Sequence, residues 1–135
     1  MDECVFCAII AGTHEKTLLY EDDEFVAFLD NRPVFRGHTL VVPKQHIASF
    51  DDLPIEKIQP LFALAQKIMR AAEKGLPADG ALVLLNNKVS QSVPHVHVHV
   101  IPRKFKFSLR GFLWPRKKLS AIEAIDIQKK IKQYL

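Results

Sequence analysis

The hydrophobic pattern of the chain changes its period several times, and each change marks an expected element. Short apolar runs at residues 17–20 and 25–30 flank the polar stretch EDDE, which predicts a β-hairpin. The run HTLVVP at 38–43 is a third strand candidate that ends at Pro43. The runs ALVLLN at 81–86 and HVHVHV at 95–100 predict a fourth and a fifth strand.

Two segments carry the period of a helix. Between the third and fourth strands, apolar residues recur at helical spacing from Ile58 to Ala72, and Gly75 is a plausible stop. Pro60 lies inside this pattern, so the helix either starts within four residues of Pro60 or kinks there. The order of hairpin, helix and further strands predicts one α+β domain over residues 1–135, with a five-stranded antiparallel sheet.

A second helix is predicted at the C-terminus. Ser120 and Glu123 have the S-x-x-E spacing of a capping box. The apolar residues that follow lie on one stripe of the helix: Ile122, Ile125, Ile131 and Leu135.

Composition excludes several classes of protein. A hydrophobic content of 48% and a charged content of 25% fit a globular domain with a core. The net charge of +4 favours an anionic partner. The acidic N-terminus lacks the basic region of a signal peptide, and the longest apolar run, at 5–11, is too short to span a bilayer. We therefore expect a cytoplasmic protein that does not enter a membrane, and two cysteines argue against a disulfide scaffold.

Three of the six histidines alternate with valine in the fifth strand. His95, His97 and His99 should share one face, about 6.6 Å apart, while the valines face the core. Pro94 and Pro102 bracket the run and should mark the strand ends. Because each buried imidazole nitrogen needs a partner, a functional site is favoured over a solvated polar face. Such histidines can bind a metal, or one can attack phosphorus while its neighbours orient it, and the alternation alone does not decide.

The surrounding segments resemble the histidine triad (HIT) family of nucleotide-binding hydrolases and transferases, in its bacterial branch with an N-terminal CxxC. HVHVHVI matches the family signature, in which histidine alternates with apolar residues. Five further segments follow in the family's order: CVFCAIIAG (4–12), FVAFLD (25–30), GHTLVVPKQH (37–46), the NN pair (86–87) and QSV (91–93). The resemblance covers a core of residues 4–103, and the tail at 104–135 diverges. It implies a homodimer whose sheets join edge to edge through the fourth strand, with the long helices packed together.

The resemblance also implies roles for individual residues. His97 would be the nucleophile that attacks the α-phosphate and forms a nucleotidyl-histidine. His99 and Ser92 would contact phosphate oxygens or the leaving group, and His38 would be a fourth active-site histidine. Asp30 would accept hydrogen bonds from both ribose hydroxyls, although it could instead be a turn residue that caps the strand end.

Other implied positions concern the base and the phosphate. An apolar slot for a purine base would be formed by Val5, Phe6, Ile9 and Phe28, each of which could equally be core. Asn86 matches a polar residue on the phosphate side, a role that Asn87 could also take. Ser90 stands where glycine is usual and the loop NNKVSQSV is shorter than in the family, so the phosphate loop should differ in shape. His99, where the transferase branch has glutamine, favours a hydrolase.

Cys4 and Cys7 form a C-x-x-C motif, which alone fits a redox pair, half of a zinc site or coincidence. A thioredoxin-like fold needs a strand before the motif, and residue 4 leaves no room for one. The resemblance supplies His46 and His95 as the other two ligands of a structural zinc ion. Otherwise the cysteines are unliganded, and His95 joins the active site as a neighbour that fixes the tautomer of His97.

The segment 103–118 holds seven lysines and arginines and no acid, with four aromatic residues between them: Phe105, Phe107, Phe112 and Trp114. This composition could bind nucleic acid by charge and stacking. It could equally be a basic loop whose aromatic side chains pack inward, and nucleic acid is not the partner we expect.

The favoured function is hydrolysis of nucleoside phosphoramidates, dinucleoside polyphosphates or related nucleotidyl conjugates. One alternative is a nucleotide-binding adaptor with little catalysis. Another is a metal-binding or redox protein built on CxxC and HxHxH, which predicts no nucleotide affinity. Turnover of an adenosine phosphoramidate, compared with binding alone, separates the first two hypotheses.

Overall fold

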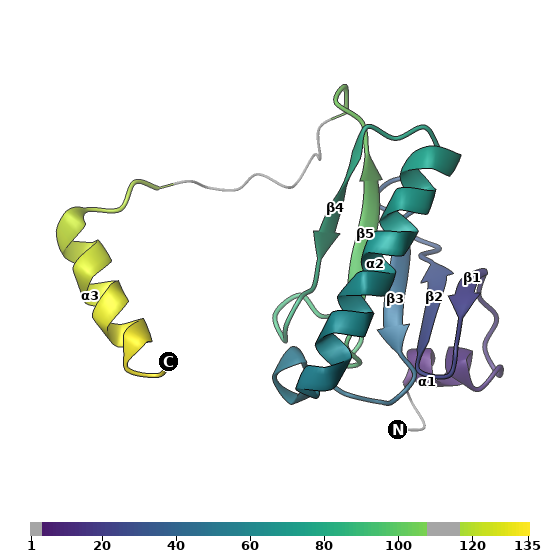
Figure 1. The fold of residues 1–135 in the computed structure, drawn as a ribbon, viewed down its shortest axis with the longest axis horizontal. Coiled ribbons are helices and arrows are strands. Elements are labelled where there is room, and N and C mark those ends of the chain that lie inside the picture. Colours follow the sequence, from purple (N-terminus) through teal and green to yellow (C-terminus); the bar gives the residue numbers. More distant parts are fainter. Residues whose placement is uncertain (1–3, 108–116) are drawn as a thin grey trace.

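The computed structural model describes residues 4–107 and 117–135 (Figure 1). One short and one long helix, a 3-10 turn and five strands form the main body, and a further helix lies near the C-terminus. In chain order they are α1 (Val5–Ile10), β1 (Leu18–Glu21), β2 (Phe25–Leu29), β3 (Thr39–Pro43), η1 (Phe50–Asp52), α2 (Ile55–Gly75), β4 (Gly80–Leu84), β5 (Val98–Arg103) and α3 (Ala121–Lys132).

The five strands form one sheet in the order β1-β2-β3-β5-β4, and every neighbouring pair is antiparallel. This confirms the predicted α+β class, the hairpin and the five-stranded sheet. The strand that carries the histidines lies between β3 and β4, with Leu40 opposite His99 on one side and Leu84 opposite His99 on the other. Within the described residues β4 forms one edge of the sheet.

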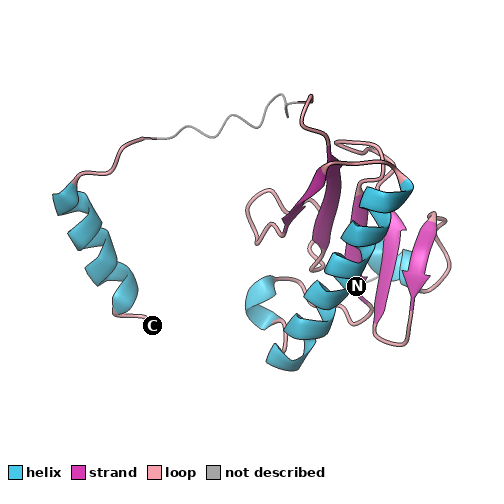
Figure 2. Ribbon diagram, turned by 45° about the horizontal axis from the view of Figure 1, so that its top comes forward, coloured by secondary structure: helices cyan, strands magenta, loops and turns pink. Residues whose placement is uncertain are grey.

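Alternation along the strands divides the core into two layers. Helix α2 lies across one face of the sheet (Figure 2). The residues that pack with it are Phe25, Ala27, Val41, Val98 and Val100. Their neighbours in sequence pack with α1 on the other face: Val26, Phe28, Leu40 and Val42. Because successive strand residues point to opposite faces, His97 and His99 lie on the α1 face.

Helix α2 covers one face of the sheet and buries Leu61, Leu64, Ala65 and Ile68, at helical spacing. It begins at Ile55 and runs through Pro60, so its start lies outside the predicted window. Proline has no N–H to donate to the carbonyl four residues earlier, and that residue, Glu56, is exposed to solvent. The helix tolerates the proline because water can reach the unpaired carbonyl.

Two features of β5 differ from the sequence-based expectation. The regular strand begins only at Val98, after a bend that holds Pro94 and His95, and it continues through Pro102. Pro102 was expected to end the strand. Pairing with β3 stops at Val100, opposite Thr39, so on that side Pro102 lies beyond the ladder and its missing N–H interrupts nothing.

Helix α3 has the predicted Ser120 cap, since the N–H of Glu123 donates to Ser120 Oγ at 3.2 Å. The Glu123 carboxylate accepts from the Ser120 hydroxyl at 2.9 Å, whereas a full capping box would use the backbone N–H of Ser120. Its apolar stripe is exposed along its whole length. Phe112 and Trp114 lie outside the described residues. In the parts of the chain that the structure covers, no helix combines the length and apolarity that a bilayer crossing requires.

Candidate active site and metal cluster

The predicted nucleophile His97 lies directly before β5 and is only 4% exposed. Its Nδ1 is 2.7 Å from the backbone carbonyl of His95, an acceptor, so Nδ1 carries the proton. The ring of Phe6 meets it edge to face at 5.0 Å between centroids. The other nitrogen, Nε2, therefore keeps its lone pair, which is the state a nucleophile requires.

His38 and His99 form a directed hydrogen-bond chain. The N–H of Val34 donates to His38 Nδ1 at 3.1 Å, so the proton of neutral His38 is on Nε2. That Nε2 donates to His99 Nδ1 at 2.9 Å, and it lies 3.7 Å from Asp30 Oδ2. Consequently neutral His99 carries its proton on Nε2, where it can donate to an oxygen of a ligand.

The three side chains Asp30, His38 and His99 also have ligand atoms within 4.8 Å of one another, which is close enough to hold a metal ion. The hydrogen bond from Val34 argues against that use. It occupies one nitrogen of His38 and leaves the proton on Nε2, the atom that a metal would have to bind. The group is better suited to donate hydrogen bonds.

Burial keeps these imidazoles neutral near pH 7. Desolvation lowers the pKa of His97, opposed by the carbonyl of His95 and the charge of Asp30. Desolvation, followed by repulsion from His97 and His38, lowers the pKa of His99 to about 4. Desolvation also lowers the pKa of His38, although Asp30 acts in the opposite direction.

Asp30 follows β2 directly, and its side chain is 22% exposed. Its Oδ1 accepts the N–H of Arg32 at 2.9 Å, so the turn-capping contact that we considered as an alternative does exist. Oδ2 faces the histidines. A cavity of about 620 Å³ lies beside it, lined by Glu15, Lys16, Thr17, Leu29, Asp30 and Asn31. This volume is in the range of small-molecule sites.

The residues expected around the base lie between α1 and the sheet. Phe6, Ile9 and Phe28 are buried, and Phe6 contacts Phe28 edge to face at 5.4 Å. Val5 is half-buried. The side chains are thus part of the core layer next to His97, and Phe6 is the one in direct contact with its ring.

The side chains of Asn87, Lys88 and Gln91 hold the loop before the triad: Gln91 donates to the carbonyl of Ala48 and accepts the N–H of Lys88, and Lys88 pairs with Asp51. Asn87 makes two further contacts. Its Oδ1 accepts the N–H of Phe50 at 2.9 Å, and its amide donates to Asp51. Asn86 donates to the carbonyl of Ser90 at 3.3 Å, within the loop. Ser92 is exposed, and no hydrogen bond within the described residues connects it to the histidines. Asn87 is therefore committed to a structural role, which leaves Asn86 and Ser92 as the side chains that could turn toward a phosphate.

This loop keeps a left-handed backbone without glycine. Lys88 has φ of 69° and Ser90 has φ of 63°. Both values lie in the region that side chains with a Cβ disfavour. The conformation that glycine would favour is therefore present at Ser90, where it is strained. The predicted difference in shape from the family's loop stays a prediction.

Four side chains from three distant segments converge at the other end of the histidine run. Cys7 Sγ lies 3.3 Å from His46 Nδ1 and 3.7 Å from His95 Nδ1, and Cys4 Sγ lies 3.5 Å from His95 Nδ1. His46 Nδ1 and His95 Nδ1 are 3.2 Å apart. A tetrahedral zinc ion, with Zn–S of about 2.3 Å and Zn–N of about 2.0 Å, would separate sulfur from nitrogen by about 3.5 Å and two nitrogens by about 3.3 Å. The spacing fits zinc.

The electrostatics of the cluster also favour a cation. His95 Nε2 donates to the carbonyl of Pro43 at 2.7 Å, which leaves the Nδ1 lone pair directed at the cysteines. Burial and the neighbouring Cys4 raise the pKa of the Cys7 thiol. A thiolate in this position therefore needs a compensating positive charge. The backbone groups of Val34, Pro43 and His95 that set these tautomers have no signal in the sequence, because every residue except proline offers the same backbone atoms.

The fold and the site together define a class: a small α+β protein with a buried imidazole directly before a central strand, next to a cysteine–histidine cluster. The chain belongs to the HIT domain family, whose model matches residues 11–106. It is similar to a HIT family protein from Bacillus subtilis, at 36% identity over 98% of this chain and 97% of that chain, with a TM-score of 0.85.

Two further relatives bear on the site. A Zn-bound histidine triad family protein from Mycobacterium smegmatis is 36% identical, covering 99% of both chains, with a TM-score of 0.78. The adenosine 5′-monophosphoramidase HNT1 of Candida albicans is 32% identical over 138 aligned residues, covering 98% of this chain and 91% of that protein. The family model begins after Cys4 and Cys7, so the cysteine–histidine cluster lies partly outside the region that defines the family.

Proposed function

We propose that the protein is a nucleotide hydrolase that cleaves the bond between the α-phosphate of a purine nucleotide and its leaving group. The substrates would be nucleoside phosphoramidates, dinucleoside polyphosphates or related conjugates. The observation that carries this proposal is the hydrogen bond from His97 Nδ1 to the carbonyl of His95, which leaves Nε2 as a nucleophile. The similarity to an adenosine 5′-monophosphoramidase supports the same substrate class.

The reaction would proceed in two displacements at phosphorus. His97 Nε2 attacks the α-phosphorus, and the bond to the leaving group breaks with its electron pair on the leaving group. The phosphorylated ring is positive, and its Nδ1–H remains bonded to the His95 carbonyl, which stabilises that charge. Water then attacks the phosphorus and returns the electron pair to Nε2. Its released proton balances the one that the leaving group takes up.

The neighbouring groups would position the substrate. His99 donates from Nε2 to a phosphate oxygen because His38 occupies its Nδ1. Asp30 would accept hydrogen bonds from the ribose hydroxyls through the oxygen that Arg32 does not occupy. Phe6 and Ile9, with Phe28 behind them, would form the apolar wall for the base, and Ser92 and Asn86 would contact the phosphate side.

We also propose that Cys4, Cys7, His46 and His95 hold a structural zinc ion, as the donor spacing and the chemistry of the donor set support. Bound zinc would supply no chemistry to the reaction; it would keep two thiolates and two neutral imidazoles in place. A zinc-bound relative of 36% identity is consistent with this assignment.

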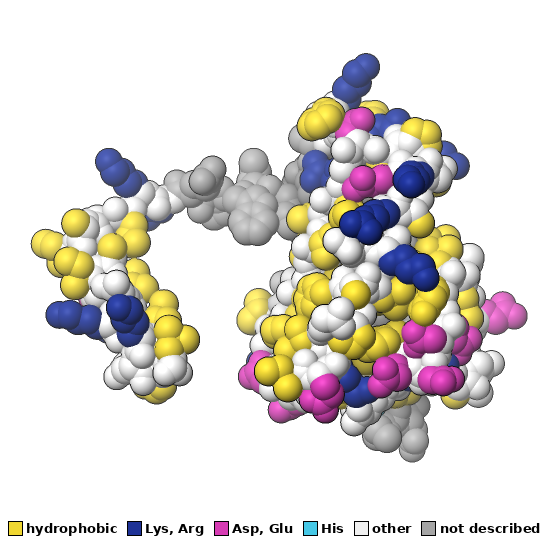
Figure 3. All heavy atoms as spheres, in the orientation of Figure 1, with side chains coloured by type: hydrophobic (Ala, Val, Ile, Leu, Met, Phe, Trp, Pro, Cys, Tyr) yellow, Lys and Arg dark blue, Asp and Glu magenta, His cyan; other side chains and the backbone are white. Residues whose placement is uncertain are grey.

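The proposed assembly is a homodimer joined through the edge strand β4. Apolar side chains are exposed around β4 and the start of α2: Phe50, Ile55, Phe62, Val83 and Val89. Figure 3 shows hydrophobic side chains gathered over the same half of α2. An unpaired strand next to an apolar surface favours pairing with a second copy. Sedimentation of a stable monomer at micromolar concentration would contradict this.

The catalytic test is His97→Ala, with the exposed His14→Ala as the matched control. Hydrolysis of adenosine 5′-phosphoramidate should fall by about three orders of magnitude or more in His97→Ala and should not change in His14→Ala. Acid-quenched native protein should carry an adenylyl group on His97 by mass spectrometry. Nucleotide binding without turnover by the native protein would indicate the adaptor, and the absence of binding would indicate the metal or redox alternative.

A further inference from the structure

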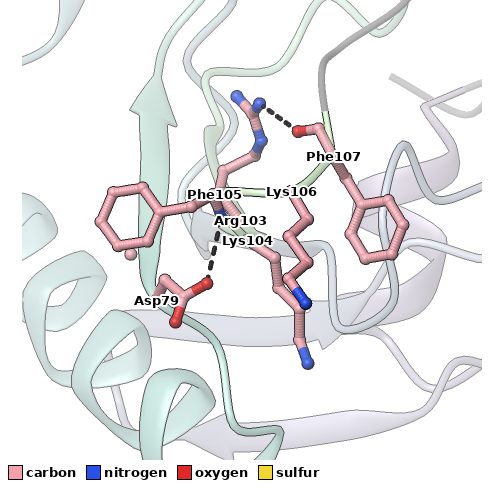
Figure 4. A pocket seen from close by; sticks show the side chains of 7 residues that line it. Asp79, Arg103, Lys104, Phe105, Lys106 and Phe107 are labelled. Carbon is pink, nitrogen blue, oxygen red and sulfur yellow. Dashed lines mark hydrogen bonds between the residues drawn. The ribbon is translucent and has the colours of Figure 1, made fainter.

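A second pocket, separate from the triad, lies at the far end of β5. It has a volume of about 400 Å³ and is lined by Asp79, Gly80, Arg103, Lys104, Phe105, Lys106 and Phe107. Figure 4 shows Lys104 and Lys106 extending in the same direction, while the rings of Phe105 and Phe107 lie to either side. None of these residues has a role in the proposed reaction.

The chemistry of the lining favours a phosphate-bearing ligand with a flat ring. Three cations and one carboxylate line the pocket, and Asp79 is already engaged, because its Oδ2 accepts the N–H of Phe105 at 3.0 Å. In Figure 4 the two lysines extend together, whereas Arg103 extends the other way. Phe105 is 93% exposed, and an exposed phenyl ring gains contact area when a base stacks on it. Two lysines that extend the same way repel each other until an anion lies between them.

Arg103 is the cation of the pocket whose side chain has a hydrogen-bond partner among the lining residues. Its Nη2 donates to the carbonyl of Phe107 at 3.0 Å, which fixes the guanidinium. Its Nε is buried, yet among the described residues no acceptor contacts it. A buried N–H without a partner costs free energy, so contacts within the protein do not fully satisfy the Arg103 guanidinium.

The pocket is connected to the proposed active site in two ways. Arg103 and His99 have the same parity on β5, and four residues of strand place them about 13 Å apart along the same face. The loop between Asp30 and His38 also touches the pocket, because Phe35 packs against Phe107 at 6.0 Å between ring centroids. A polyphosphate chain ending in a second nucleoside can bridge this distance, whereas ammonia or a small amine cannot.

We propose that this pocket binds the anionic leaving-group half of a dinucleoside polyphosphate, and so selects such substrates over phosphoramidates with small neutral leaving groups. Lys104 and Lys106 would contact the distal phosphates, and Phe105 would stack on the second base. The inference rests on the proposed hydrolase function for the reaction, but the anion site itself can be measured without turnover.

The experiment compares two lysine pairs in the full-length protein. The pocket variant is Lys104→Gln/Lys106→Gln, and the control is Lys117→Gln/Lys118→Gln, which removes the same charge from exposed lysines outside the lining. Each is assayed with diadenosine tetraphosphate and with adenosine 5′-phosphoramidate. Binding of inorganic tripolyphosphate is measured by calorimetry in parallel.

The pocket variant should raise KM for diadenosine tetraphosphate about tenfold and change kcat/KM for the phosphoramidate less than twofold, and the control should change neither. Phe105→Ala should raise KM for diadenosine tetraphosphate and leave the binding of tripolyphosphate unchanged. If the native protein hydrolyses neither substrate, the proposed function fails, while weaker tripolyphosphate binding in the pocket variant alone still supports the anion site.

Equal effects of the two lysine pairs would overturn the proposal, because bulk charge would then be the cause. Unchanged tripolyphosphate binding in the pocket variant would overturn it whether or not the protein is an active hydrolase. A single-stranded oligoribonucleotide that binds more tightly than tripolyphosphate, and is weakened by both lysine pairs, would identify the segment as a nucleic-acid surface instead.

Discussion

Removal of the proposed zinc ion should destabilise the whole domain rather than the N-terminus alone. The change is Cys4→Ser/Cys7→Ser, which removes both thiolates. The ligands join helix α1, the segment after β3 and the bend before β5, so a bound ion ties three distant parts of the chain together. The unfolded chain without metal lacks these ties and gains the corresponding conformational entropy.

The size of the effect can be estimated from the loops that the ion closes. Cys7 and His46 are 39 residues apart, and His46 and His95 are 49 residues apart. In the chain-entropy model of a cross-link, a loop of either length contributes about 4 kcal/mol. Real cross-links deliver less than the model, so we expect a loss of about 4 kcal/mol in total. At about 3 °C per kcal/mol, this lowers Tm by about 12 °C.

The assay is thermal unfolding of native protein, chelator-treated native protein and the double variant, with zinc determined by elemental analysis. Native protein should contain about one zinc per chain. Chelated native protein and the variant should share the same lowered Tm, and chelator should not affect the variant. That agreement separates loss of metal from any cost of placing serine at Cys4. The prediction is wrong if native protein that was never exposed to chelator holds no zinc. It is also wrong if the Tm of the variant lies within about 3 °C of the Tm of native protein.

The remaining predictions concern the nucleotide site and the loop before it. Asp30→Ala should reduce the preference for AMP over 2′-deoxy-AMP from at least about tenfold to near unity, because charge-assisted hydrogen bonds to the hydroxyls are lost; equal native affinities for the two sugars would contradict the ribose role. Ser90→Gly should raise the free energy of unfolding by about 0.5–1 kcal/mol, since Ser90 has φ of 63°; Ser92→Gly, whose φ is not positive, is the control and should not stabilise. The pKa of His99 is lowered to about 4 in the folded protein. As pH falls, His99 in the unfolded chain therefore takes up a proton at a higher pH than His99 in the folded protein. His99 therefore contributes stability that is complete above about pH 6.5 and declines toward pH 4, by at most about 1.4 kcal/mol per pH unit. In the Cys4→Ser/Cys7→Ser background, His99→Gln should flatten this decline, and an unchanged slope would refute it.

Much of the fold could be predicted because strand and helix periods are explicit in this sequence. The valines of the HVHVHV run face α2 as the alternation required, even though the regular strand begins only at Val98. The cap at Ser120 formed as predicted, because it depends on two residues three positions apart. Helix α1 gave no such signal, since its residues form one uninterrupted apolar run, and both faces of that run are partly covered.

The tautomers of the candidate active-site histidines could not be predicted from the sequence. They depend on which backbone group each ring nitrogen meets: Val34 N–H for His38, and the carbonyls of Pro43 and His95 for His95 and His97. Such contacts arise only when the strands and the connecting loops are packed. The predicted distance of about 6.6 Å between neighbouring imidazoles was too long. The ring centroids of His97 and His99 are 4.9 Å apart, because His97 lies before the regular strand.

His95 contacts both the proposed metal ligands, through its side chain, and the proposed nucleophile His97, through its backbone carbonyl. Its side chain faces the cysteines with Nδ1 and is anchored to Pro43 by Nε2, while its backbone carbonyl accepts the proton of His97 Nδ1. Loss of metal releases the ring from one of its two attachments, but the hydrogen bonds to Pro43 and from His97 remain. The geometry of Nε2 should therefore loosen without being lost. For this reason the zinc-free variant, assayed well below its Tm, should retain measurable hydrolysis at a reduced kcat, and it should still accumulate the adenylyl group on His97. Complete loss of activity in a folded zinc-free protein would mean that the metal acts on the substrate directly, which its position behind His95 does not favour.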